Sequence, residues 1–209
     1  MQKNPWLEIP YSDYEEHMAH STVKQLQALN EITKILLEKI KPEVFALLGC
    51  STGNGLEHVD EEVTKVVHCL DINPEYLEIT AKRHKNIKKL RLHHLDINKD
   101  KLTFENIDLF HIALVLEYVD IEITLNKLCQ SLSQKGCLSI VIQKSKKENT
   151  SFVSKTPYKS LEKLASISKE IKKETVEKFL IGKNLDLVEL QEVGLNKYKS
   201  FIWMIFKKK

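Results

Sequence analysis

A short apolar run that leads into a glycine-rich loop constrains the fold of this chain more than any other stretch. Residues 44–48, VFALL, are typical of a fully buried strand. The loop after them has small residues at Gly49, Ser51 and Gly53, and glycine lets a ligand approach the main chain closely. Residues 54–59 can then open a helix whose free N–H groups face the ligand. A strand, a glycine loop and a helix in this order predict the first crossover of a nucleotide-binding α/β sheet.

Two further apolar runs each end in an acidic residue. Residues 65–70, KVVHCL, are followed by Asp71, and a third strand candidate over residues 90–95 is followed by Asp96. A carboxylate about 20 residues past a glycine loop suits a pair of ribose hydroxyls, because it accepts two hydrogen bonds at once. These pieces predict a ligand that contains a ribose, but Asp71 alone does not decide which nucleotide it is.

The four pieces together resemble the class I S-adenosylmethionine (SAM)-dependent methyltransferases. They follow the order of that family: LLGCSTGNG at 47–55, VVHCLD at 66–71, HLDI at 94–97 and IDLFHIALVLEYV at 107–119. The resemblance covers residues 40–145 well and the rest of the chain loosely. It departs from the family pattern at Leu47, where an acid is usual, and at Ser51, where a glycine is usual. That acid helps to orient the ammonium group of SAM, so this chain must hold the methionine end partly by other means.

The resemblance implies an α/β fold. Its seven-stranded, mostly parallel sheet is doubly wound, with the strand order 3-2-1-4-5-7-6, an antiparallel strand 7 and helices on both faces. Residues 1–209 would form a single methyltransferase domain. Within it we expect an N-terminal helical lid or cap over residues 1–40, a SAM-binding core over 41–145, and C-terminal helices with a β-hairpin over 146–209.

Local patterns place further elements around this core. Ser12-Asp13-Tyr14-Glu15 fits a capping box at a helix start, and apolar periodicity predicts a second helix over residues 21–40. Asn73-Pro74-Glu75 fits the N-cap and first turn of another helix. Residues 185–193 and 199–207 have the pattern of two strands joined by a short turn. This last pair agrees with the terminal hairpin that the resemblance implies.

Aromatic and titratable side chains are concentrated in residues 6–18. Two interpretations of this segment stay open: a helix packed on the edge of the sheet, or a lid over the ligand, which N-terminal segments in this superfamily often provide. As a lid it would place Tyr11, Tyr14 and His17 against the methyl acceptor. The polar, lysine-rich residues 143–157 are expected to form a mobile connection.

The resemblance also assigns the site residues. Glu117 and Tyr118 are the polar side chains expected beside the acceptor, and they are the candidate catalytic residues. His111 lies between apolar neighbours, which is more typical of a core histidine than of a catalytic base. No cluster demands a metal, since the adjacent His93-His94 would point to opposite faces of a strand. SAM, or its product S-adenosyl-L-homocysteine (SAH), would contact Gly49, Cys50, Ser51, Gly53, Asp71, Ile72, Asp96, Ile97 and Ala113.

Composition sets the remaining limits. With 42% hydrophobic and 29% charged residues, the chain has the make-up of an ordinary globular protein. We expect a cytoplasmic monomer or homodimer without a signal peptide or a membrane span, because no apolar run is long enough for either. The four cysteines have no metal-like spacing and are expected to be reduced thiols. A net charge of +3 is too small to indicate a nucleic-acid partner by itself.

Three classes of function stay open. The leading hypothesis is a SAM-dependent methyltransferase that acts on a small molecule. An RNA or protein methyltransferase of the same fold is supported only by the basic stretches within residues 144–173. The third class is a non-catalytic binding protein for SAM or a dinucleotide. Residues 49–54, GCSTGN, lack the G-x-G-x-x-G pattern expected for a dinucleotide, and Asp96 matches the position that receives the adenine amino group in methyltransferases.

Overall fold

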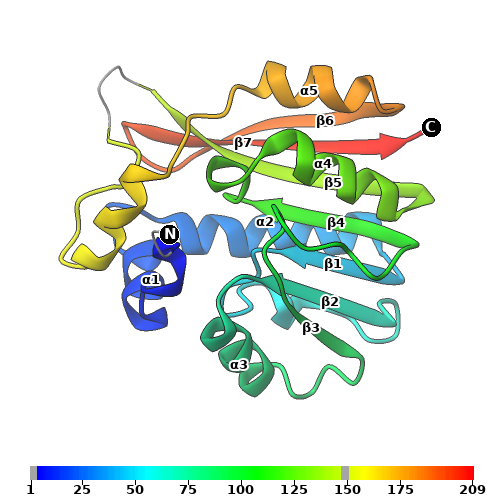
Figure 1. Cartoon of the computed structure of the whole chain (residues 1–209), viewed down its shortest axis with the longest axis horizontal. Coiled ribbons are helices and arrows are strands. Elements are labelled where there is room, and N and C mark those ends of the chain that lie inside the picture. The colour runs from blue at the N-terminus through cyan, green and yellow to red at the C-terminus, as the bar shows by residue number, and fades with distance from the viewer. Residues whose placement is uncertain (1–3, 147–150) are drawn as a thin grey trace.

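Seven strands form one sheet in the computed structural model, which describes residues 4–146 and 151–209 (Figure 1). Their spatial order is β3-β2-β1-β4-β5-β7-β6, and only β7 runs antiparallel to its neighbours, β5 and β6. The order and the direction of the strands are those predicted. The strands are β1 (Val44–Leu48), β2 (Val66–Asp71), β3 (Leu90–His94), β4 (Ile107–Ala113), β5 (Leu132–Ser145), β6 (Leu185–Gly194) and β7 (Lys199–Lys208).

Helices cover both faces of this sheet (Figure 1). Side chains alternate between the faces of a strand, so neighbouring residues of β1 enter different cores. Ala46 and Leu48 pack with residues of α4 and α5, whereas Phe45 and Leu47 pack with residues of α2 and α3. The α-helices are α1 (Tyr11–Ala19), α2 (Gln25–Ile40), α3 (Pro74–Arg83), α4 (Ile121–Ser131) and α5 (Lys173–Ile181). Short 3₁₀ helices lie at Pro5–Leu7, Leu56–His58, Leu116–Tyr118 and Lys159–Ser166.

The prediction of a helix directly after the glycine loop is wrong. Only the 3₁₀ turn Leu56–His58 forms there. Gly53 and Gly55 have φ angles of 85° and 90°, and such left-handed residues interrupt a right-handed helix. The chain therefore crosses from β1 to β2 through turns, and the N-terminus of a long helix does not point at the ligand edge of the sheet.

Two expected helix starts also differ. Helix α1 begins at Tyr11 after Pro10, without a side-chain cap, so the predicted capping box does not form. Helix α2 begins at Gln25 instead of Ser21, because Lys24 is left-handed with φ 59°. The predicted cap of α3 is confirmed: the Asn73 side chain accepts a hydrogen bond from the Glu75 N–H at 3.0 Å.

The C-terminal hairpin is confirmed as β6 and β7. Strand β5 extends to Ser145, which is further than the sequence indicated, and residues 147–150 of the expected mobile connection lie outside the described residues. Because β7 is antiparallel, its first residue pairs with the last residue of β5, Lys199 with Ser145. The start of β7 therefore lies at the edge of the sheet where the parallel strands end.

The N-terminal segment lies at this same edge. The Asn73 side chain donates to the Trp6 carbonyl at 2.9 Å, and the Tyr76 hydroxyl donates to the Ile9 carbonyl at 2.9 Å. The 3₁₀ segment Lys159–Ser166 lies beside α1, joined to it by a hydrogen bond from Ser160 to Asp13 (Figure 1). Over the described parts of the chain, none of the helices has both the length and the hydropathy that crossing a bilayer requires.

Candidate functional site

One cavity of about 140 Å³ lies at the carboxyl edge of the parallel strands. Five parts of the chain contribute to its wall: the glycine loop, the ends of the strands, the N-terminal segment, the first turns of α2, and residues 152–164 with the start of β7. Parallel α/β sheets bind ligands at this edge, so the position of the cavity agrees with the sequence-based prediction. Ten of the predicted site residues line it: Gly49, Ser51, Asp71, Ile72, Asp96, Ile97, Ala113, Tyr118, Tyr14 and His17.

The glycine loop is held closely against the end of β2. The N–H groups of Gly49 and Cys50 both donate to the Leu70 carbonyl, at 2.8 and 3.1 Å. Gly49 has φ 68°, and a Cβ added there would lie 2.4 Å from Cγ2 of Val115. A side chain at position 49 would thus be excluded both by backbone strain and by contact. The loop leaves its main chain exposed to the cavity instead.

Asp71 is the buried carboxylate of the site, with 9% of its surface exposed. Its Oδ2 accepts a hydrogen bond from the Ser51 N–H and its Oδ1 accepts one from the Asn73 N–H, both at 2.8 Å. A carboxylate has about four lone-pair sites, so two are left for a ligand. Burial raises the pKa of Asp71 to about 6, although these N–H groups oppose the shift. The carboxylate is thus fixed in place and keeps free acceptor capacity.

The next strand end supplies the second acid. Asp96 Oδ1 accepts from the Asn98 N–H at 3.0 Å, and Asp96 Oδ2 lies 2.9 Å from Lys99 Nζ. Ile97 is buried beside it in the cavity wall. A polar group next to an apolar wall at this position can recognise one edge and one face of a flat heterocycle.

Aromatic side chains of the N-terminal segment cover the cavity. The Trp6 ring meets Tyr118 edge to face with centroids 5.1 Å apart, and it contacts Tyr14 at 6.0 Å. Burial raises the pKa of Tyr14 to about 12, so its hydroxyl keeps its proton at neutral pH. His17 is also buried, and its Nδ1 lies 2.8 Å from the Thr156 hydroxyl. The segment thus lies over the ligand edge, as the lid interpretation requires.

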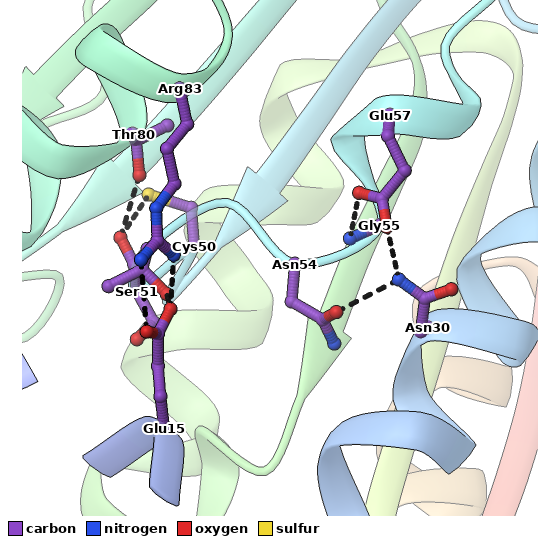
Figure 2. A network of polar contacts seen from close by, with 10 residues as sticks. Glu15, Asn30, Cys50, Ser51, Asn54, Gly55, Glu57, Thr80 and Arg83 are labelled. Carbon is purple, nitrogen blue, oxygen red and sulfur yellow. Dashed lines mark hydrogen bonds and ion pairs between the residues drawn. The ribbon is translucent and has the colours of Figure 1, made fainter. Parts of the chain in front are cut away.

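Polar contacts fasten this cover to the glycine loop (Figure 2). Glu15 of α1 forms an ion pair with Arg83 of α3, and the Thr52 hydroxyl donates to Glu15 Oε1 at 2.5 Å. The Thr80 hydroxyl donates to the Ser51 carbonyl at 2.8 Å. We call Glu15, Arg83 and Thr52 the latch, because together they join α1, α3 and the loop.

Helix α2 holds the far side of the loop (Figure 2). The Asn30 amide donates to Asn54 Oδ1 at 2.9 Å and also to Glu57 Oε1. Glu57 Oε2 accepts from the Gly55 N–H at 2.9 Å. The loop is therefore held from both sides in the free protein, so less conformational entropy is lost when a ligand binds.

Four predicted site residues do not line the cavity. Cys50 is buried behind the loop, and Gly53 faces α3, where an added Cβ would lie 2.7 Å from Nε2 of His84. Tyr11, the first residue of α1, lies outside the wall as well. The fourth is Glu117.

Glu117 is fully buried in a separate environment. Its Oε1 accepts from the Gln143 N–H at 2.9 Å, and within the described residues its Oε2 has no hydrogen-bond partner. Burial raises the pKa of Glu117 to about 7. Tyr118, its neighbour in the same 3₁₀ turn, lines the cavity instead. The two candidate catalytic residues thus have different surroundings.

A polar group at the other end of the cavity was missed by the sequence analysis. It consists of Gln25, Gln143 and Lys199. The Gln25 amide donates to Gln143 Oε1 at 2.7 Å, and Lys199 begins β7. One signal was available: a lysine precedes the apolar run 201–206, and an antiparallel strand 7 places that lysine at the ligand edge. Among the described residues, no three His, Cys, Asp or Glu side chains are arranged to hold a metal ion.

Comparison with known proteins agrees with this geometry. Residues 47–138 match a family model described as a methyltransferase domain. No curated protein matches the chain by sequence.

Three solved structures share the fold, at identities low enough that the likeness concerns the fold alone. The N-methyltransferase NodS from Bradyrhizobium japonicum WM9, in complex with SAH, aligns with a TM-score of 0.66 and 16% identity over 95% of this chain and 97% of NodS. Magnesium protoporphyrin IX methyltransferase (ChlM) from Synechocystis PCC 6803, with bound SAH, aligns at 0.66 and 13% identity over 90% of this chain and 84% of its own. The trans-methyltransferase CalH, complexed with SAH, aligns at 0.66 and 16% identity over 86% of this chain, which spans about half (55%) of CalH.

Proposed function

We propose that this chain, a SAM-dependent methyltransferase by its matched domain and its fold, transfers a methyl group to a small-molecule acceptor. The observation that carries the proposal is the single cavity that joins Asp71 and the glycine loop to an aromatic cover. A donor site at one end and a covered space beside it are what transfer to a small acceptor requires.

The residues at the donor end fit SAM. Asp71 has two acceptor positions left for the ribose hydroxyls, and Asp96 with Ile97 would receive the adenine. Ser51 Oγ is buried at the cavity, beside the Tyr14 hydroxyl. A hydroxyl can both donate and accept hydrogen bonds, so Ser51 is a candidate for the methionine end in place of the usual acid.

Bound SAM supplies an activated methyl group on a sulfonium, so the chemistry needs little help from the protein. What the chain contributes is alignment and the exclusion of water. The Trp6–Tyr118 contact closes the cavity, and Tyr118 and Tyr14 keep their protons and can donate hydrogen bonds to the acceptor. Glu117, which lies outside the cavity wall, would act by supporting the turn that carries Tyr118.

We infer from the size of the cavity that the cover moves. Sites for small molecules and cofactors measure about 300–1,000 Å³, whereas this cavity has about 140 Å³. Donor and acceptor together therefore need the N-terminal segment to open and close again. A covered cavity of this kind favours a small acceptor over an RNA or protein side chain.

The four cysteines of the chain are unpaired thiols, and three of them are buried. Because disulfides are rare in the cytosol, we infer a cytoplasmic enzyme from these free thiols.

Two measurements test the proposal. Titration calorimetry should show binding of SAM and SAH, and no binding of NAD. Incubation of the protein with methyl-labelled SAM and fractionated small metabolites should then transfer label to a compound of low molecular mass. Binding of NAD without any response to SAH would overturn the family assignment. Binding of SAH with label transferred only to RNA or protein would overturn the acceptor class.

A further inference from the structure

Lys199 is a buried amine in the wall of the cavity. Only 3% of its surface is exposed, although lysine is among the residues least often buried. Its Nζ donates to the Phe152 carbonyl and to the Ser154 hydroxyl, the latter at 3.0 Å. An ammonium has three donors, so one is left without an acceptor in the described part of the chain.

Within the described residues, no negative charge compensates this ammonium. Over residues 4–146 and 151–209, no carboxylate lies within 4.0 Å of Lys199 Nζ. His17 of α1 faces it, and burial lowers the pKa of His17 to about 4, so this histidine is neutral at pH 7. Burial also lowers the pKa of Lys199 to about 8. The charge is therefore mostly present at pH 7, and burying it unpaired costs free energy that an anionic ligand would offset.

The residues around Lys199 indicate what the rest of that ligand is like. Gln143 donates to the Phe152 carbonyl at 3.0 Å and accepts from Gln25, so the polar neighbours are uncharged amides. The remaining wall is apolar and aromatic, with the Tyr118 and Phe152 rings 6.2 Å apart and Leu161 buried beside them. A molecule with an apolar body and a single anionic end matches this wall.

Lys199 also lies at the end of the cavity opposite to the proposed ribose site. Asp71 ends β2 and Lys199 begins β7, and four strand spacings separate these two strands in the sheet. At about 4.8 Å per spacing, this places them roughly 19 Å apart across the sheet. The donor methyl group would then lie between the two ends, within reach of an acceptor held at Lys199.

We propose that Lys199 is a binding residue for the methyl acceptor and that the acceptor is a carboxylate with an apolar body. This inference rests on the proposed function. The competing explanation is structural: Lys199 could serve only to fasten residues 152–154 to β7. The two explanations differ in what they predict for ligands and for stability.

The test compares acids with their amides on the SAH-loaded full-length protein at pH 7. The probes are phenylacetate, indole-3-acetate and hexanoate, each with its uncharged amide, and affinities are measured by titration calorimetry or ligand-observed NMR. We expect at least one acid to bind at least tenfold more tightly than its amide. This preference should decline above about pH 8, as Lys199 loses its proton. Equal affinity for every acid and its amide, or no binding of any acid, would overturn the inference without any need for a variant.

Variants then locate the effect. Lys199→Met should abolish the preference for the acid, leave SAH affinity within about twofold, and leave the melting temperature unchanged or higher, because it removes a buried charge. Lys144→Met is the matched control: Lys144 lies on β5 opposite Ser200, is exposed and pairs with Glu192. It should change nothing. If Lys199→Met keeps the preference for the acid, Lys199 is only a structural contact.

Failure of the proposed function would look different. Wild-type protein that does not bind SAH would overturn the donor site, and acid–amide titrations without SAH would still decide whether Lys199 selects anions.

Discussion

The pH dependence of SAH binding tests the assignment of Asp71 directly. In the free protein Asp71 has a pKa of about 6, because burial disfavours the charged form. Two ribose hydroxyls can donate to it fully only when it is ionised, so the complex favours the carboxylate. Binding should therefore weaken as pH falls through about 6.

The magnitude follows from that pKa. At pH 5 roughly one molecule in eleven carries the ionised carboxylate, so the dissociation constant should be about tenfold higher than at pH 8, equivalent to about 1.4 kcal/mol. Between pH 7 and 8 the dissociation constant should be flat. Protonation of Asp71 does not itself destabilise the fold: since the folded pKa is raised above its ordinary value of 3.8, the contribution of Asp71 to stability falls between about pH 4 and 6 as pH rises. Asp71 by itself therefore stabilises the domain more at pH 5 than at pH 7, whereas the buried His17, with a pKa lowered to about 4, acts in the opposite direction.

Titration calorimetry with SAH from pH 5 to pH 8 measures the profile, and Asp71→Asn is the control. This variant should bind SAH about 2 kcal/mol more weakly at pH 7 and lose the dependence between pH 5 and 7. Alanine is a poorer choice, because the Ser51 and Asn73 N–H groups would lose their buried acceptors and stability would fall. A wild-type dissociation constant that is the same at pH 5 and pH 8 would refute the reasoning.

Three further predictions use other parts of the site. Gly49→Ala should lower the melting temperature and abolish SAH binding, because the φ of 68° and the nearby Val115 side chain exclude a Cβ. Gly194→Ala is the control and should do neither, because its added Cβ would meet only a lysine Nζ at 3.9 Å. The buried Glu117 carboxyl, with a pKa raised to about 7, makes a contribution to the unfolding free energy that falls as pH rises from about 4.5 to 7. In urea titrations, the stability of the wild type should therefore fall relative to that of Glu117→Gln over that range. Glu15→Gln should lower the free energy of unfolding by about 0.2–1 kcal/mol, since the ion pair of Glu15 with Arg83 is partly exposed. It should also speed amide hydrogen exchange in α1. Unchanged exchange would show that the latch does not hold the cover.

The residues at the proposed donor end of the cavity could be brought together from sequence alone because their determinants are local. Each is a short run in which a buried strand ends at the residue concerned, as at Gly49, Asp71 and Asp96. Parallel strands bring these ends to one edge whatever the rest of the chain does. The order of the strands followed from the family resemblance in the same way.

The proposed acceptor end could not be predicted in this way, because its residues come from distant parts of the chain. Gln25, Gln143 and Lys199 meet only after β7 inserts between β5 and β6. Local geometry set a second limit. The 3₁₀ turn places Tyr118 in the cavity wall and leaves Glu117 outside it, and left-handed glycines replaced an expected helix with a turn. None of these backbone choices leaves a periodic pattern in the sequence.

The position of β7 between β5 and β6 has a consequence for synthesis of the protein. Strand β7 pairs with both β5 and β6, so neither of those strands has its final neighbour until β7 has left the ribosome. Until then the 14-residue β5 presents a long, apolar, unpaired edge, the kind of surface through which nascent chains aggregate. Loss of β7 would therefore do more than leave the pocket incomplete. It would leave an unpaired edge on β5 that is prone to aggregation and that folding chaperones must cover.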